Sequence, residues 1–287
     1  MAKISINGCE LYYEDSGGHD KPVVVLSHGL LWSSAMFQAQ VEALSDRYRV
    51  ICYDHRGQGR SAVPRGRVVT IEACYRDAVA LIEALNLGPC HFGGLSMGGF
   101  VAMRIAARRP DLLRSCVLME TSADPEPLEN VGPYRRLNLV ARWIGLRLVA
   151  DKVMPIMFGR SFMTDPQRGA ERELWRGRLM ANRRSIYKAV NGVIERAGVY
   201  HELRRIELPT LIIVGDEDTA TTPEKSRRLH EAISGSKLVL IEGAGHTSSV
   251  EQPVSVSFAL RQFLDEVEDA REREASDGDG PERRADT

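Results

Sequence analysis

The chain has 287 residues, which fits one large α/β domain with an insertion or two ordinary domains. Hydrophobic residues make up 43%, enough for a sizeable core, and the formal net charge of -1 gives no general attraction to nucleic acid or to an anionic membrane. The five cysteines are scattered, odd in number and without a C-x-x-C pair, as expected of core thiols in a reducing compartment. The N-terminus lacks the apolar stretch of a signal peptide, and no segment is long enough to span a bilayer. We therefore expect a cytoplasmic protein with neither nucleic acid nor membrane as its partner.

The first 120 residues alternate between strand and helix patterns. Strands are predicted at 3–6 and 10–14 (a hairpin around Asn7-Gly8), 22–27, 49–53, 90–95 and 115–120, and helices at 33–46, 71–86 and 97–109. Continuous apolar runs such as Val23–Leu26 are typical of strands buried on both faces. Buried strands alternating with helices predict a mostly parallel sheet with helices on both faces.

This rhythm stops at Ser122, and no buried-strand pattern occurs before His201. Residues 122–201 are helical in pattern, and we call them the cap. The cap is rich in arginine, and these side chains form either a solvated face or a lid that attracts anionic substrates: Arg135, Arg136, Arg142, Arg147, Arg176, Arg178, Arg183 and Arg184. It also contains tryptophans and methionines that either pack the core or line an acyl pocket: Trp143, Trp175, Met154, Met157, Met163 and Met180.

The alternation then resumes with strands at 209–215 and 237–242 and helices at 223–233 and 254–268. The sequence therefore predicts an α/β core domain formed by residues 1–121 and 202–268, with the cap covering the strand ends. Residues 269–287 have almost no apolar content and are predicted to be a disordered tail.

The pattern Gly94-Leu95-Ser96-Met97-Gly98 joins a predicted strand to a predicted helix. A serine in that position lies on a sharp turn, a nucleophile elbow, with its hydroxyl held out for attack on a carbonyl. The flanking glycines leave room for the turn, and the helix N-terminus places partial positive charge near the developing oxyanion.

A serine nucleophile needs a base, and the base needs an orienting acid. His246 follows the predicted strand 237–242 in a glycine-rich loop, at the sheet edge where α/β proteins build their sites. Asp218 is our choice for the acid. Asp216 and Glu217 are competing choices that alternatively cap backbone amides in the turn.

Two backbone N–H groups are predicted to form an oxyanion hole. One belongs to Met97, directly after the nucleophile, and the other to Leu30, in the loop after strand 22–27. Gly29 is expected to let the backbone turn and aim the Leu30 N–H, while the adjacent His28 is expected to brace the loop.

Together these segments resemble the α/β-hydrolase family over residues 4–267. The segments that carry the resemblance are Ser27–Gly29, Asp54–Ser61, Gly94–Gly98, Gly215–Asp218 and Gly245-His246. Residues 94–99 and 245–253 look most like 3-oxoadipate enol-lactonases and small lactonases or esterases. The resemblance implies an α/β-hydrolase fold, a Ser96-Asp218-His246 triad, and Leu30 and Met97 as oxyanion donors. Many relatives have an aromatic residue and a proline where this chain has Leu30-Leu31, which leaves the shape of the acyl pocket open.

Neither a cofactor nor a metal is predicted. Gly57–Ala62 matches a dinucleotide-binding fingerprint, but Pro64 and Gly66 follow where a helix should start, so we interpret it as a structural corner with Asp54 and Arg56 bonding within it. The histidines are far apart in sequence, and no H-E-x-x-H occurs.

The resulting hypothesis is a serine hydrolase of carboxylic esters and lactones, of the enol-lactone or acyl-homoserine lactone type. Cofactor-free perhydrolysis of the haloperoxidase kind, or carbon–carbon bond hydrolysis with the same triad, is one alternative. A non-catalytic ligand-binding protein of the same fold is another. The sequence does not indicate the substrate or the oligomeric state.

Overall fold

A computed structural model describes residues 2–278 of the chain. Its centre is an eight-stranded sheet with the order β1-β2-β4-β3-β5-β6-β7-β8. The strands are β1 (Ala2–Ile6), β2 (Cys9–Asp15), β3 (Val23–Ser27), β4 (Arg49–Tyr53), β5 (Cys90–Leu95), β6 (Leu113–Met119), β7 (Thr210–Gly215) and β8 (Lys237–Ile241). The first two strands pair antiparallel and β2 pairs antiparallel with β4, whereas every later pairing is parallel. The predicted mostly parallel sheet is confirmed.

Burial explains the apolar strand runs. All six residues of β5 and of β7 are buried, because helices cover both faces of the sheet there. The parallel register places Ser27 beside Gly94 and Leu95 beside Met119. The carboxyl ends of β3, β5, β6, β7 and β8 therefore meet at one edge of the sheet.

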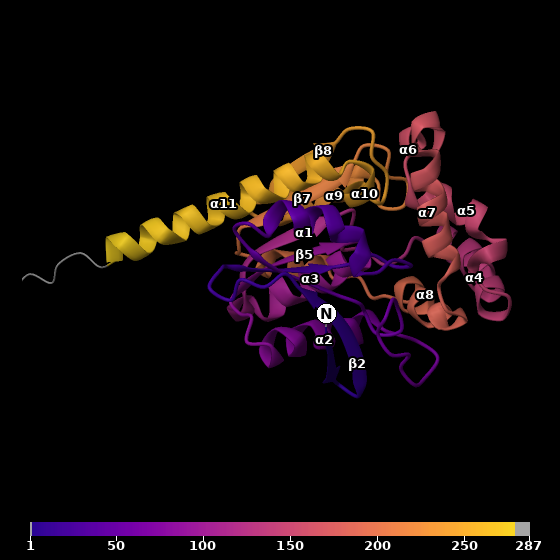
Figure 1. The fold of residues 1–287 in the computed structure, drawn as a ribbon, viewed down its shortest axis with the longest axis horizontal. Coiled ribbons are helices and arrows are strands. Elements are labelled where there is room, and N and C mark those ends of the chain that lie inside the picture. Colours follow the sequence, from indigo (N-terminus) through magenta and orange to yellow (C-terminus); the bar gives the residue numbers. More distant parts are fainter. Residues whose placement is uncertain (1, 279–287) are drawn as a thin grey trace, which may run out of the picture.

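Helices form the outer layers (Figure 1). They are α1 (Gln38–Leu44), α2 (Ile71–Ala84), α3 (Met97–Arg108), α9 (Pro223–Ala232), α10 (Ser248–Glu251) and α11 (Pro253–Gly278). On one side of the sheet α1 packs against α11, and on the other α2 packs against α3. Within residues 2–278, no helix combines the length and apolar character that crossing a membrane requires.

Between β6 and β7 the cap contains helices and short 3₁₀ turns, and none of its residues lies in a strand. Its helices are α4 (Leu128–Trp143), α5 (Ala150–Met157), α6 (Arg160–Thr164), α7 (Gly169–Met180) and α8 (Tyr187–Ile194). Figure 1 shows them gathered at one end of the molecule, away from the free end of α11.

Helix α11 corrects the prediction of a disordered tail from residue 269. The helix continues to Gly278, ten residues beyond the predicted end of the core. Residues 271–276 are exposed, and the alanine, arginine and glutamate residues at 270–275 favour helix without burial, while Asp269 pairs with Arg47. The remaining predicted tail residues, 279–287, lie outside the described residues.

Candidate active site

The nucleophile elbow has the strained backbone that its motif predicts. Ser96 sits between β5 and α3 with φ 53° and ψ −109°, a conformation that L side chains rarely adopt. A Cβ at Gly94 would lie 2.1 Å from the Gly98 carbonyl oxygen, and one at Gly98 would lie 2.0 Å from the Ser27 carbonyl oxygen. No side chain therefore fits at either position, and the missing Cβ atoms allow the turn to be this tight.

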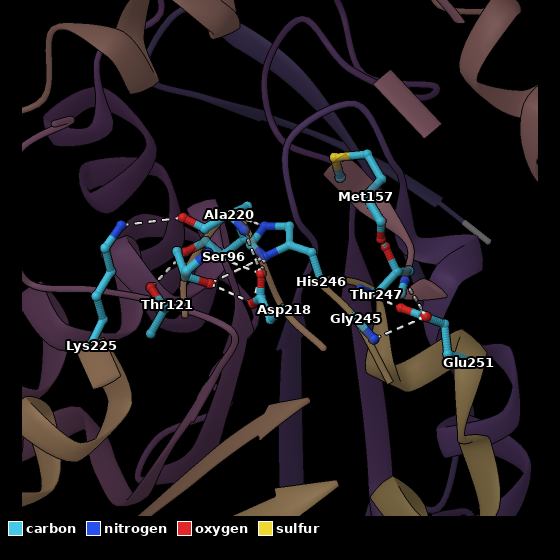
Figure 2. Close-up of polar contacts among 12 residues, drawn as sticks. Ser96, Thr121, Met157, Asp218, Ala220, Lys225, Gly245, His246, Thr247 and Glu251 are labelled. Atoms are coloured by element: carbon cyan, nitrogen blue, oxygen red, sulfur yellow. Dashed lines mark hydrogen bonds and ion pairs between the residues drawn. The ribbon is translucent and has the colours of Figure 1, made fainter. Parts of the chain in front are cut away.

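Three side chains from distant parts of the chain form one hydrogen-bonded line (Figure 2). The Oγ atom of Ser96 lies 2.9 Å from Nε2 of His246, and Nδ1 of His246 lies 2.9 Å from Oδ2 of Asp218. Because a carboxylate can only accept, Nδ1 carries the proton, and Nε2 is left to accept from the serine hydroxyl. All three residues are buried, with Ser96 8% exposed.

Asp218 is held by a turn that the sequence analysis did not identify as part of the site. Its Oδ1 accepts the N–H groups of Ala220 and Thr221, and its Oδ2 accepts the Thr221 hydroxyl at 2.7 Å. Burial acts to raise the pKa of Asp218, but the adjacent His246 and the Thr221 donors outweigh it and lower that pKa. The recognisable signal is a threonine three residues after the aspartate, two residues before a helix that starts at Pro223.

The competing carboxylates have other partners. Oδ1 of Asp216 accepts the backbone N–H of Gly243, and Glu217 accepts both the N–H and the hydroxyl of Ser161 in the cap. Neither carboxylate contacts His246. Both accept backbone N–H groups, as in the alternative that gives them a capping role.

His28 is braced within its loop, as expected. Its Nδ1 donates to the Gly29 carbonyl at 2.7 Å, and its Nε2 accepts the backbone N–H of His55 at 2.9 Å. Burial lowers the pKa of His28 and holds the pKa of His55 well below its ordinary value. Both imidazoles are therefore neutral, and His28 has no free nitrogen to act as a base.

The loop after β3 places Leu30 at the wall of a cavity that also contains Ser96. No acceptor for the Leu30 N–H occurs among the hydrogen bonds of residues 2–278, and Met97 is the first residue of α3, where an N–H has no partner within the helix. The expected role of Gly29 is corrected. The left-handed residue is Leu31, with φ 72°, whereas Gly29 matters because a Cβ there would lie 3.1 Å from the Leu95 side chain.

The corner at residues 57–62 is structural, with one correction. Oδ2 of Asp54 accepts the N–H of Arg60 within the corner, as predicted. Arg56 instead leaves the corner and pairs with Asp77 of α2. Gly59 has φ 51°, and its backbone lies against the Asp54 carboxylate, so this corner is filled by its own side chains.

The loop that carries His246 is joined to the cap. The Glu251 carboxylate accepts the backbone N–H groups of Gly245 and Thr247 in the loop and of Gly159 in the cap. The Thr247 hydroxyl donates to the Met157 carbonyl at 2.6 Å (Figure 2). Burial raises the pKa of Glu251 to about 7, although its three N–H partners act to lower it.

Glu120 is a second buried carboxyl group near the triad. It follows β6 with φ 41°, and its buried oxygens lie near the Ser248 hydroxyl and the Gly215 backbone without meeting hydrogen-bond geometry. Burial raises the pKa of Glu120 well above its ordinary value, and the nearby Asp218 adds to that effect. Both influences favour the protonated form of the side chain.

Above the triad lies a largely apolar cavity of about 130 Å³ between the sheet edge and the cap. Its cap-side wall includes Val149, Val153, Met157, Val190 and Ile194. Of the cap methionines and tryptophans singled out in the sequence, Met157 alone lines this cavity. Trp175 packs against Trp32, and Trp143 is 65% exposed. A cavity of this size is comparable to an apolar one of about 150 Å³ that holds benzene.

No group of three or more His, Cys, Asp or Glu side chains in residues 2–278 could hold a metal ion.

A family model described as the alpha/beta hydrolase fold matches residues 22–253. The chain belongs to the α/β hydrolase fold family. Ser96 directly follows β5 and His246 follows β8, at the positions in the fold that the resemblance implied.

Comparison with individual α/β hydrolases gives relatives of several activities. The chain is 30% identical over 257 residues to 3-oxoadipate enol-lactonase 2 of Acinetobacter baylyi (strain ATCC 33305 / BD413 / ADP1), covering 88% of this chain and 92% of that protein. It is equally identical to RutD of Pseudomonas syringae pv. syringae (strain B728a), provisionally named a carbamate hydrolase, covering 85% and 94%. The structure of a thermophilic esterase from Thermogutta terrifontis is similar with a TM-score of 0.85 and 33% identity, over 93% of this chain and 98% of that one.

Proposed function

We propose that the protein is a serine hydrolase that cleaves small carboxylic esters, lactones included, through an acyl-enzyme. The observation that carries the proposal is the unbroken line from the Ser96 hydroxyl through His246 to Asp218, with both hydrogen bonds at 2.9 Å. The small apolar cavity above it suits a short acyl chain or a lactone ring. Likeness to an enol-lactonase and an esterase supports the same class of substrate.

The mechanism follows from the protonation states in this line. His246 Nε2 takes the proton of Ser96 as its Oγ attacks the substrate carbonyl, while Asp218 holds the imidazole and stabilises the cation that forms. The N–H groups of Leu30 and Met97 stabilise the oxyanion, each by roughly 3 kcal/mol. His246 returns the proton to the leaving group, and a water molecule deprotonated by the same nitrogen then hydrolyses the acyl-enzyme.

The test is hydrolysis of p-nitrophenyl butanoate by wild type, Ser96→Ala and a matched control. Ser249→Ala is the control, because Ser249 is equally buried and its hydroxyl has no hydrogen-bond partner within residues 2–278. We expect Ser96→Ala to lose at least about 10³-fold in kcat, with Ser249→Ala close to wild type. Equal rates for wild type and Ser96→Ala would refute the proposal.

A substrate panel separates the alternatives that share this triad. It consists of a linear ester, a five-membered lactone, an alkyl carbamate, a β-diketone and an assay for peracid formation. The ester and lactone are expected to be turned over fastest. Peracid formation without ester or lactone hydrolysis favours the perhydrolase alternative, and diketone cleavage alone favours the carbon–carbon hydrolase alternative. Folded protein that turns over nothing and does not react with a fluorophosphonate at Ser96 favours a ligand-binding role.

A further inference from the structure

Besides Thr221 beside the triad and Asn138 on α4, three polar side chains line the cavity above Ser96. They are Glu126, Tyr134 and Arg196, among walls that are otherwise mostly aliphatic. We call these three residues the polar wall. Glu126 lies in the segment between β6 and the cap helices, Tyr134 lies on α4, and Arg196 lies just after α8. Residues from three separate segments therefore bring polar groups to one part of a small cavity.

Arg196 is held rigidly. Its side chain is 3% exposed, and Nη1 donates to Oε2 of Glu126 at 2.6 Å and to the Val193 carbonyl at 2.9 Å. Its guanidinium carbon lies 4.4 Å from the ring centre of Phe100, which is one helical turn after Ser96 along α3. The polar wall is thus anchored to the helix that begins at the nucleophile.

The charges of the polar wall are already balanced. Glu126 neutralises Arg196. The charged groups that act on Tyr134 are this pair and Asp218. A carboxylate on a substrate would find no uncompensated cation there and would have to lose its hydration, which is unfavourable in a small, largely apolar cavity. An uncharged oxygen has no such cost.

A donor for an uncharged oxygen is present. No hydrogen bond within residues 2–278 involves the Tyr134 hydroxyl, although the residue lines the cavity. Burial and the nearby Glu126 raise the pKa of Tyr134, so the hydroxyl keeps its proton and can donate. Tyr134 is only partly buried and its hydroxyl is not among the buried polar atoms without a partner, so water can pair with it in the free protein and a substrate acceptor would take the place of that water.

We propose that the polar wall selects substrates whose acyl group carries an uncharged oxygen acceptor, a ketone or hydroxyl, a few bonds beyond the reacting carbonyl. Tyr134 donates to this oxygen, and the Arg196–Glu126 pair excludes a carboxylate at the same place. This inference rests on the proposed ester hydrolysis and specifies its substrate class.

The experiment measures kcat/KM for p-nitrophenyl 4-oxopentanoate and 5-oxohexanoate, and for the alkyl counterparts p-nitrophenyl pentanoate and hexanoate. Each value is divided by the rate constant for uncatalysed hydrolysis of the same ester by hydroxide, which corrects for differences in intrinsic reactivity. Mono-p-nitrophenyl glutarate is the carboxylate probe. Wild type is expected to prefer the better oxo ester over its alkyl counterpart by about five-fold, the worth of one neutral hydrogen bond, and to hydrolyse the glutarate more slowly than either. In Tyr134→Phe the ratio of oxo-ester to alkyl-ester kcat/KM should fall to about one.

Tyr187→Phe is the matched control, because Tyr187 is also on a cap helix but does not line the cavity. It should keep the wild-type preference. Equal rates for oxo and alkyl esters in wild type, an unchanged preference in Tyr134→Phe, or glutarate hydrolysis as fast as the oxo ester would each overturn the inference. The wild-type comparison decides it even if Tyr134→Phe fails to fold. The proposed function fails separately, if wild type hydrolyses no ester or Ser96→Ala retains the activity.

Discussion

Gly98 offers a direct test of how closely the nucleophile elbow is packed. In Gly98→Ala the new Cβ would lie 2.0 Å from the Ser27 carbonyl oxygen, about 1.4 Å short of the 3.4 Å at which ordinary contact begins. The two nearest atoms belong to the Ser27 backbone, so the start of α3 must move away from β3. Such overpacking costs about 1–3 kcal/mol of unfolding free energy, partly offset by the better helix propensity of alanine.

The same movement separates the two proposed oxyanion donors. Met97 moves with α3, whereas Leu30 stays with the loop after β3, and a misplacement of about 1 Å can cost roughly 10²-fold in rate. We therefore expect Gly98→Ala to be less stable in urea unfolding and at least about 100-fold lower in kcat/KM for p-nitrophenyl butanoate.

Gly177→Ala is the control for this prediction. Gly177 is also helical, but a Cβ there meets no atom within 4 Å, so the variant should be unchanged or up to about 1 kcal/mol more stable, with full activity. If Gly98→Ala matches Gly177→Ala in both stability and activity, the close approach of α3 to β3 is not what shapes the elbow.

Two further predictions concern the groups around His246. Thr221→Val removes the hydroxyl that favours ionised Asp218, so urea unfolding at pH 7 should show a loss of about 1.5–3 kcal/mol that Thr221→Ser avoids. This contribution is lost as pH falls through the lowered folded-state pKa of Asp218. The difference in unfolding free energy between wild type and Thr221→Val should therefore narrow at acid pH, and a constant difference would contradict the role given to the hydroxyl. Glu251 has a folded-state pKa of about 7 against an ordinary 4.5, so between these values folded protein holds a proton that the unfolded chain has released. Glu251 therefore makes the free energy of unfolding fall as pH rises from about 4.5 to about 7. In Glu251→Gln the free energy of unfolding should depend less on pH over this range than in wild type. The same pH dependence in both proteins would contradict this prediction.

Much of the fold and the proposed triad could be predicted because both depend on order along the chain. Strands buried on both faces are long apolar runs, and parallel strands bring their carboxyl ends to the same edge. Ser96 and Asp218 follow such strands and His246 follows the parallel edge strand β8, so the topology brings all three to the same edge of the sheet. Gly94 and Gly98 are recognisable because the contact distances at the turn tolerate no side chain.

What could not be predicted depends on packing between distant segments. The left-handed turn falls at Leu31 and not at a glycine, since the loop is fixed by contacts such as the Leu31 N–H donating to Gln58. Arg196 and Glu126 are 70 residues apart, and nothing local marks them as a pair. The extension of α11 departs from the prediction because low apolar content indicates disorder, whereas helix propensity sustains this segment.

The shared hydrogen bonds of Glu251 and Thr247 have a consequence for redesign by segment exchange. A foreign sequence across the whole of residues 122–201 would keep the Gly159 N–H donor and the Met157 carbonyl acceptor only if its backbone followed the same path, because both groups belong to the main chain. A chimera that lost this path would change specificity and disturb the proposed proton relay at once. Splice points that leave residues 157–161 with the host would let binding preference be rebuilt on α4 and α8 while the base stays where it is.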